Sequence, residues 1–124
     1  MKLSQLSKEA ADCCAILRRD KRYAVVHPGD FHVKGDGGKT LVNAAGAFAA
    51  VRLGARHGID LIPDAFSDKW AVNLDAIDHM ASGRMVQALE TMGLINGAAD
   101  NIPMLECPEE TLRAVAYLLE GLSC

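Results

Sequence analysis

The side chains whose types and spacing could do chemistry gather in residues 23–42, YAVVHPGDFHVKGDGGKTLV. Inside this segment His27, Asp30 and His32 supply two imidazoles and a carboxylate in the run HPGDFH. Such groups ligate a divalent metal when three of them converge on one face. The alternative is that both histidines are surface residues beside a Pro-Gly turn. In that case the strand alternation directs His32 into solvent.

A second candidate site is rich in glycine. Residues 35–40 read GDGGKT, which resembles the tail of a phosphate-binding loop, whose amides and lysine hold phosphate oxygens. The match is partial, because the motif needs a glycine where Val33 stands. A hairpin loop explains the same residues, since glycine accepts positive φ. The candidate ligand-binding residues are Gly35, Gly37, Gly38, Lys39 and Thr40.

The piece PGDFH, residues 28–32, resembles a turn of the cupin family, in which a histidine after Pro-Gly ligates a metal inside a β-barrel. The likeness is confined to this piece. A cupin barrel needs many more strands than a mostly helical chain supplies, and the first HxH motif of that family is absent. The family's fold and metal site are therefore not carried over to this chain.

Two further patterns have both a chemical and a structural interpretation. Asp75 and His79 are one helical turn apart, so the carboxylate could orient the imidazole for base catalysis, but no nucleophile accompanies them. A basic run at residues 18–22 could contact phosphates, and such binding would weaken steeply with salt. Cations at a helix C-terminus are equally well explained by the helix dipole. The basic residues of this run are Arg18, Arg19, Lys21 and Arg22.

Length and composition limit the class of protein. A chain of 124 residues has the size of one domain, and 50% apolar with 23% charged residues excludes a disordered chain. We expect a single globular domain over residues 1–124. A net charge of −3 argues against general nucleic-acid binding. No apolar run approaches the roughly 20 residues of a membrane span, and no secretory signal is recognisable, so we expect a cytoplasmic protein.

The four cysteines do not form a recognisable metal or disulfide pattern. Cys13 and Cys14 are adjacent in a helical pattern, Cys107 precedes a proline, and no CxxC pair occurs. We expect reduced thiols, with Cys13 on an apolar helix face as a small core residue. No cofactor is predicted.

The elements that must position these residues follow from the spacing of apolar side chains. One face of residues 3–17 is apolar at helical spacing, and Ser4 or Ser7 can cap this helix. Short β-type runs at residues 23–26, 31–34 and 39–42 predict a three-stranded antiparallel meander. Asn43 should cap a buried helix that ends near His57.

The second half of the chain is expected to be helical. We predict a short strand at residues 59–62, a capped helical turn at residues 67–72, and one long helix over residues 74–92 that is kinked at Gly83. The last helix should begin after Cys107, with Pro108 at its first position and carboxylates in its first turn. The fold class is therefore α+β and helix-rich, with the meander packed on about four helices.

The absence of a complete catalytic motif favours interaction over catalysis. We expect a cytoplasmic adaptor or inhibitor of a larger protein, since compact acidic chains of this size are common among bacterial and phage accessory proteins. The high apolar content also suggests a homodimer. An acidic face could bind the basic surface of a nucleic-acid-handling partner. Its candidate residues are Asp60, Asp64, Asp68, Asp75, Asp78, Glu109 and Glu110. The alternative is a metal- or phosphate-ligand-binding protein or enzyme that uses residues 27–40.

Overall fold

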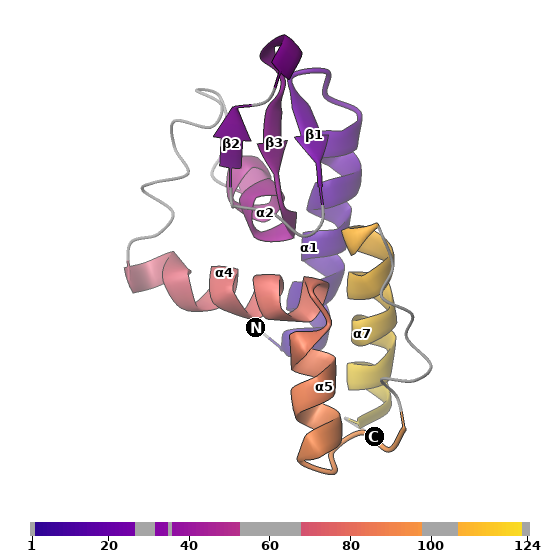
Figure 1. Ribbon diagram of the computed structural model, residues 1–124. Helices are drawn as coiled ribbons and strands as arrows, with labels where there is room; N and C mark the ends of the chain where they lie inside the picture. The colour runs from indigo at the N-terminus through magenta and orange to yellow at the C-terminus, as the bar shows by residue number, and fades with distance from the viewer. Residues whose placement is uncertain (1, 27–31, 35, 53–67, 98–106, 123–124) are drawn as a thin grey trace.

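The computed structural model describes residues 2–26, 32–34, 36–52, 68–97 and 107–122 (Figure 1). Within these ranges the fold is helix-rich α+β. The helices are α1 Leu3–Arg18, α2 Ala44–Arg52, α4 Asp68–Ala81, α5 Arg84–Thr91 and α7 Pro108–Leu122. The strands are β1 Tyr23–Val25, β2 His32–Lys34 and β3 Thr40–Val42, and one turn of 3-10 helix, η1, spans Asp36–Gly38.

The three predicted strands form, but the predicted antiparallel meander is wrong. β3 lies between the other two strands, and it pairs with β1 in parallel and with β2 antiparallel. The parallel pair is extended at both ends, because the Thr40 amide donates to the Arg22 carbonyl and the Val26 amide donates to the Val42 carbonyl, each at 2.8 Å. Turn residues mark where a strand ends but do not specify its neighbour, so strands this short leave the order of the sheet undetermined by the sequence.

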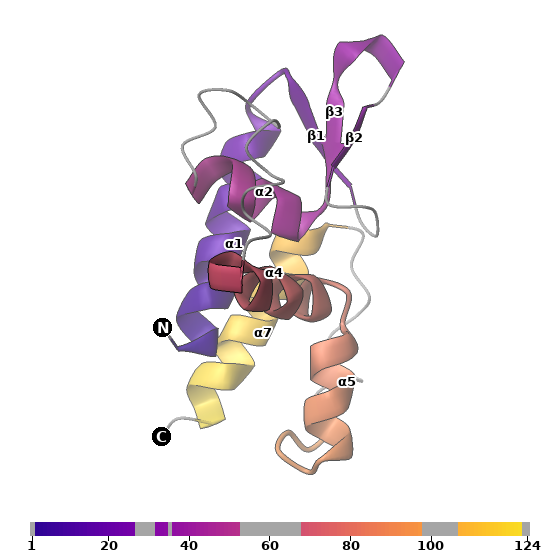
Figure 2. The ribbon, with the colours of Figure 1, turned by 90° about the vertical axis from the view of Figure 1, so that its left-hand side faces the viewer.

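The core lies where the sheet, α1, α2, α4 and α7 meet. In Figures 1 and 2, α1 and α7 run side by side in opposite directions, and α2 lies against the sheet at one end of the molecule. Alternate residues of a strand face the same side of the sheet, so the side chains of Tyr23 and Val25 in β1 both point into the core. Val42 of β3 is also buried there. The largest fully buried apolar side chains are Phe48, Leu74, Ile77, Met80, Leu112, Val42 and Val115.

Helix α1 shows the predicted apolar face but not the predicted cap. Its N-cap is Lys2, and both candidate serines lie inside the helix on its buried side. The Ser7 hydroxyl donates to the backbone oxygen of Leu112 in α7, which satisfies a polar group that is completely buried. The Ser7 side chain therefore links α1 to α7 by a hydrogen bond and does not cap α1.

Helix α2 begins as predicted. The side-chain oxygen of Asn43 accepts a hydrogen bond from the Gly46 amide at 2.8 Å, which is the geometry of an N-cap. Asn43 is itself buried, and its amide nitrogen donates to a carboxylate oxygen of Asp78 in α4 at 3.1 Å. One side chain thus starts α2 and ties it to α4. The predicted helix end at His57 and the predicted strand at residues 59–62 lie outside the described residues.

The single long helix predicted for residues 74–92 is two helices. α4 already begins at Asp68 and ends at Ala81, and α5 leaves in a different direction (Figure 1). Between them Gly83 has φ 81°, a left-handed conformation that interrupts the helical hydrogen bonds. The end of α5 agrees with the prediction. The amides of Gly93 and Leu94 donate to the carbonyls of Glu90 and Leu89, which completes a Schellman motif.

Gly83→Ala is expected to lower the free energy of unfolding by about 1–2 kcal/mol, because a Cβ is unfavourable in the left-handed region. Gly121→Ala is the matched control. Gly121 lies in α7 without a positive φ, and an added Cβ would meet nothing within 4 Å. That change should leave stability unaltered or raise it slightly, by up to about 1 kcal/mol. Urea unfolding of both variants gives the comparison, and equal stabilities would contradict the left-handed break.

Candidate functional site

The predicted metal ligands are only partly described. His27 and Asp30 lie outside the described residues, and His32 is the first residue of β2, where it pairs with Val42. Among the residues that the structure describes, no group of three or more His, Cys, Asp and Glu side chains is placed to hold a metal ion. The metal site of residues 27–32 stays a prediction.

The candidate phosphate loop lies between two strands. Gly37 and Gly38 have φ near 80°, the conformation expected of the hairpin interpretation, and β2 and β3 on either side pair antiparallel. Lys39 is exposed, and Thr40 begins β3. A phosphate-binding loop leads into a helix N-terminus, whereas this loop leads into a strand. Gly35 lies outside the described residues, so phosphate binding also stays a prediction.

The predicted acidic partner-binding residues lie in different environments. Asp75 in α4 and Glu110 in α7 are exposed. Asp78 instead accepts the hydrogen bond from Asn43, and Glu109 is mostly buried beside Arg18. Asp60 and Asp64 lie outside the described residues, as does the side chain of Asp68. The acidic face therefore stays a prediction, with two of its members engaged inside the molecule.

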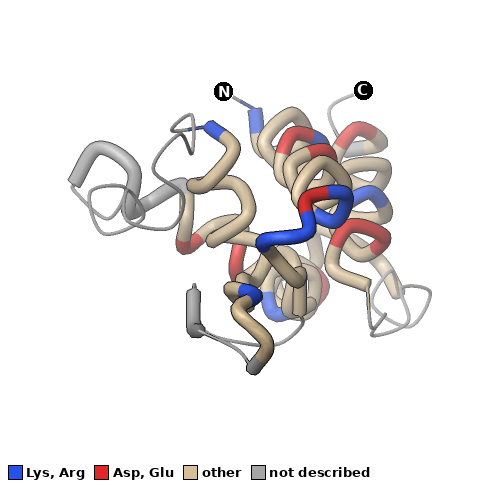
Figure 3. The backbone as a smooth tube through the Cα atoms, turned by 90° about the horizontal axis from the view of Figure 1, so that it is seen from above, with Lys and Arg blue, Asp and Glu red and all other residues tan. Residues whose placement is uncertain are grey.

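The basic run after α1 is similarly engaged. Arg18 binds Glu109, and Arg22 binds Asp20 through several hydrogen bonds that hold the pKa of that carboxyl below its ordinary value. Arg19 and Lys21 are exposed. Figure 3 shows basic and acidic segments alternating here and not a uniform basic face. Asp75 and His79 are both exposed on α4, as expected of a solvated helix pair.

Antiparallel packing of α1 and α7 creates a row of cross-helix ion pairs. They are Lys8 with Glu120, Asp12 with Arg113, and Arg18 with Glu109. The first two pairs are about half exposed, so each contributes only about 0–1 kcal/mol to stability. The third pair is different, because the Glu109 side chain keeps only 14% of its exposure.

The third pair is part of a thiol cluster, defined here as Cys107, Glu109 and Arg18. The Cys107 thiol donates a hydrogen bond to Oε1 of Glu109, and the same oxygen lies 2.5 Å from Nε of Arg18. Nη2 of Arg18 is 3.7 Å from the sulfur. Cys107 immediately precedes α7, and the amides of Glu110 and Thr111 donate to its backbone carbonyl. Sequence reasoning missed this cluster, because its two halves are about 90 residues apart in the chain.

The three described cysteines have different environments. Burial raises the pKa of Cys13 to about 11 and that of Cys14 to about 12, so both stay neutral thiols at physiological pH. This agrees with the prediction that Cys13 is a core residue. The pKa of Cys107 is also raised, first by burial and then by its hydrogen bond to Glu109. Cys107 is only half-buried, in contrast to Cys13 and Cys14.

Four exposed large apolar side chains belong to elements whose ends lie away from the sheet. These elements are the N-terminus of α1, the C-terminal half of α7 and the end of α5. Helix α7 packs along α1, and its Leu118 and Leu119 pack against Leu89 and Ile95 at the end of α5, whereas the start of α1 and the end of α5 lie apart (Figure 2). We call this region the apolar end, and its exposed members are Leu3, Met92, Leu94 and Tyr117, which keep between 42% and 77% of their exposure. Behind them, Leu89 and Ile95 form a small buried cluster with Leu118 and Leu119.

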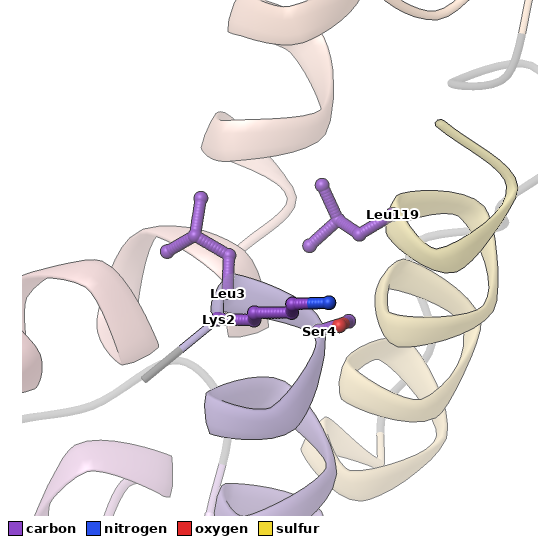
Figure 4. Close-up of a pocket in the computed structure, with 4 residues that line it drawn as sticks. All are labelled: Lys2, Leu3, Ser4 and Leu119. Atoms are coloured by element: carbon purple, nitrogen blue, oxygen red, sulfur yellow. The ribbon is translucent and has the colours of Figure 1, made fainter. Parts of the chain in front are cut away.

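A hollow of about 340 Å³ opens at the apolar end (Figure 4). Its lining residues are Lys2, Leu3, Ser4 and Leu119, and Figure 4 shows the side chains of Leu3 and Leu119 on opposite sides of it. Lys2 is the one charged residue among them, and its ammonium lies at the hollow. The arrangement can accept an apolar side chain together with a carboxylate.

Comparison with known protein families, curated proteins and solved structures finds no match to this chain. In the part of the chain that the structure describes, no helix has both the length and the apolar character required to cross a bilayer.

Proposed function

We propose that this chain is a small cytoplasmic interaction module, an adaptor or inhibitor that binds a larger protein through its apolar end. The proposal is supported by the open hollow, whose apolar walls are Leu3 and Leu119, and by further exposed large apolar side chains, which are Met92 and Leu94 after α5 and Tyr117 in α7. Water contact with so many apolar groups is unfavourable, and a partner that covers them recovers that free energy.

The apolar walls and the single cation of the hollow indicate which kind of partner segment fits it. Leu3 and Leu119 offer apolar walls, and Lys2 offers a cation at the hollow. A partner segment that carries a large apolar side chain beside an Asp or Glu satisfies both features. An amphipathic helix of a larger protein has this character.

Site-specific photo-crosslinking in lysate of the native host tests this proposal. A photoreactive residue at position 2 or position 3, both of which line the hollow, should capture the same protein, and Leu3→Glu should abolish capture from position 2. Position 16 is the matched control, because Ile16 is a 53% exposed apolar residue of α1 that does not line the hollow. Equal capture from positions 3 and 16 would contradict the proposal. Capture of a second copy of this chain would assign the surface to a homodimer instead.

A second measurement tests the predicted partner chemistry directly. An amphipathic helical peptide with glutamates next to its leucines should bind the full chain more tightly than the same peptide with lysines in those positions. Lys2→Glu should reverse this preference, whereas Lys21→Glu should not, since Lys21 is an exposed cation at the far end of α1. Identical affinities for both peptides would show that Lys2 does not recognise a carboxylate of the partner.

A further inference from the structure

The thiol cluster places a base and a cation beside a cysteine. A thiol, a carboxylate that accepts its hydrogen bond, and a guanidinium 3.7 Å from its sulfur meet at the start of α7. A base in contact with a nucleophile can take its proton during reaction, and a nearby cation stabilises the thiolate that results. The backbone amide of Glu110 also favours the thiolate form of Cys107. None of these groups belongs to the apolar end.

Two buried polar atoms in the first turns of α7 lack hydrogen-bond partners. Within the described residues, neither Oε2 of Glu109 nor Oγ1 of Thr111 makes a hydrogen bond, and Thr111 is only 2% exposed. The Thr111 amide donates to the Cys107 carbonyl at 3.4 Å, so Thr111 lies one helical turn after the cysteine, and side chains on a helix lean back toward its N-terminus. Buried polar atoms nearly always have a hydrogen-bond partner. Oε2 of Glu109 can accept a hydrogen bond from a small oxygen-bearing group on the sulfur, and the Thr111 hydroxyl can donate one to it.

We propose that Cys107 is a hydroperoxide-reactive thiol, and that the protein holds its sulfenic acid between Glu109 and Thr111. The hydroxyl of the Cys–SOH group donates to the Glu109 carboxylate, and its oxygen accepts from the Thr111 hydroxyl. Both orphan atoms then have a partner. A sulfenic acid held in this way is protected from further oxidation.

The reaction consumes one hydroperoxide and needs no other reactant. Glu109 takes the thiol proton, and the sulfur attacks one peroxide oxygen, so that an S–O bond forms while the O–O bond breaks. The departing oxygen receives the proton from Glu109 and leaves as water or an alcohol. Sulfur is oxidised by two electrons and the peroxide is reduced by two. Arg18 stabilises negative charge first on sulfur and then on the departing oxygen.

Selectivity for Cys107 follows from exposure. Cys13 and Cys14 are almost completely buried and stay protonated, whereas Cys107 is only half-buried and has a carboxylate in contact. The raised pKa of Cys107 keeps it protonated at rest, so reaction depends on transfer of the proton to Glu109. A thiolate of high basicity is also the stronger nucleophile once it forms.

Labelling of sulfenic acid in the folded chain tests the proposal. In a Cys124→Ser background, an equimolar amount of hydrogen peroxide followed by dimedone should modify Cys107 and leave Cys13 and Cys14 unmodified, as read by peptide mass spectrometry. Arg18→Gln should slow the labelling at least several-fold, whereas Arg19→Gln, its exposed neighbour, should not. Equal rates in these two variants, or labelling spread over all three cysteines, would overturn the proposal.

Two further variants separate the roles of the neighbours. Thr111→Val keeps the shape of the side chain, and should allow the first oxidation but increase conversion to sulfinic acid. Glu109→Gln should move the pH profile of Cys107 alkylation by iodoacetamide to lower pH, because the carboxylate raises the pKa of that thiol. An unchanged alkylation profile would show that Glu109 does not contact the sulfur and would overturn the assignment.

Discussion

Phe48→Ala is expected to lower the free energy of unfolding by about 3–5 kcal/mol. Phe48 lies in α2 and is 2% exposed, among the largest side chains of the core. Its removal takes apolar area out of the core and leaves a cavity that the surrounding helices can fill only in part. A natural domain has about 5–15 kcal/mol of stability in total, so this one change could remove much of it.

Urea unfolding followed by circular dichroism measures this loss. Tyr117→Ala is the matched control, since it removes an aromatic ring that is 77% exposed and should change stability by no more than about 0.5 kcal/mol. A Phe48→Ala variant as stable as the Tyr117→Ala variant would show that α2 does not pack into the core as described.

Asn43→Asp should lower the free energy of unfolding by about 2–3 kcal/mol, although aspartate is as good an N-cap as asparagine. The cap to the Gly46 amide survives this change. The hydrogen bond from Asn43 to Asp78 does not, because the donor is lost and two carboxylates then face each other in a part-buried setting. The effect therefore reports the link between α2 and α4 separately from the cap.

The double variant Asn43→Asp with Asp78→Asn supplies the control. It keeps the acceptor that caps α2 and restores a donor and an acceptor between the two positions, so most of the lost stability should return. Thermal unfolding of the two single variants and the double variant forms a complete cycle. Additive losses would mean that the side chains at positions 43 and 78 do not interact.

The two proposed sites lie at opposite ends of α7. Cys107 precedes its first residue, and Tyr117 and Leu119 belong to its last turns. A helix of this length separates its ends by roughly 20 Å, so substitutions at one site should leave the other unchanged. The crosslinking and oxidation experiments therefore test two independent properties of the same chain.

Local signals determined most of the secondary structure. The apolar spacing of α1, the Asn43 cap of α2, the glycine stop after α5 and the Pro108 start of α7 were all predictable. Each depends on residues within one or two turns of each other, and such interactions are the same in any fold. The three strands were predictable for the same reason.

Features that depend on residues far apart in the chain were decided by the tertiary structure. These features are the pairing of β1 with β3, the break between α4 and α5 at Gly83, and the hydrogen bond between Asn43 and Asp78. The thiol cluster exists only because α1 and α7 pack antiparallel, which brings Arg18 to Cys107. Periodicity states which face of an element is apolar but not which other element covers it. That choice follows from the fit of whole surfaces in the core, which no short stretch of sequence contains.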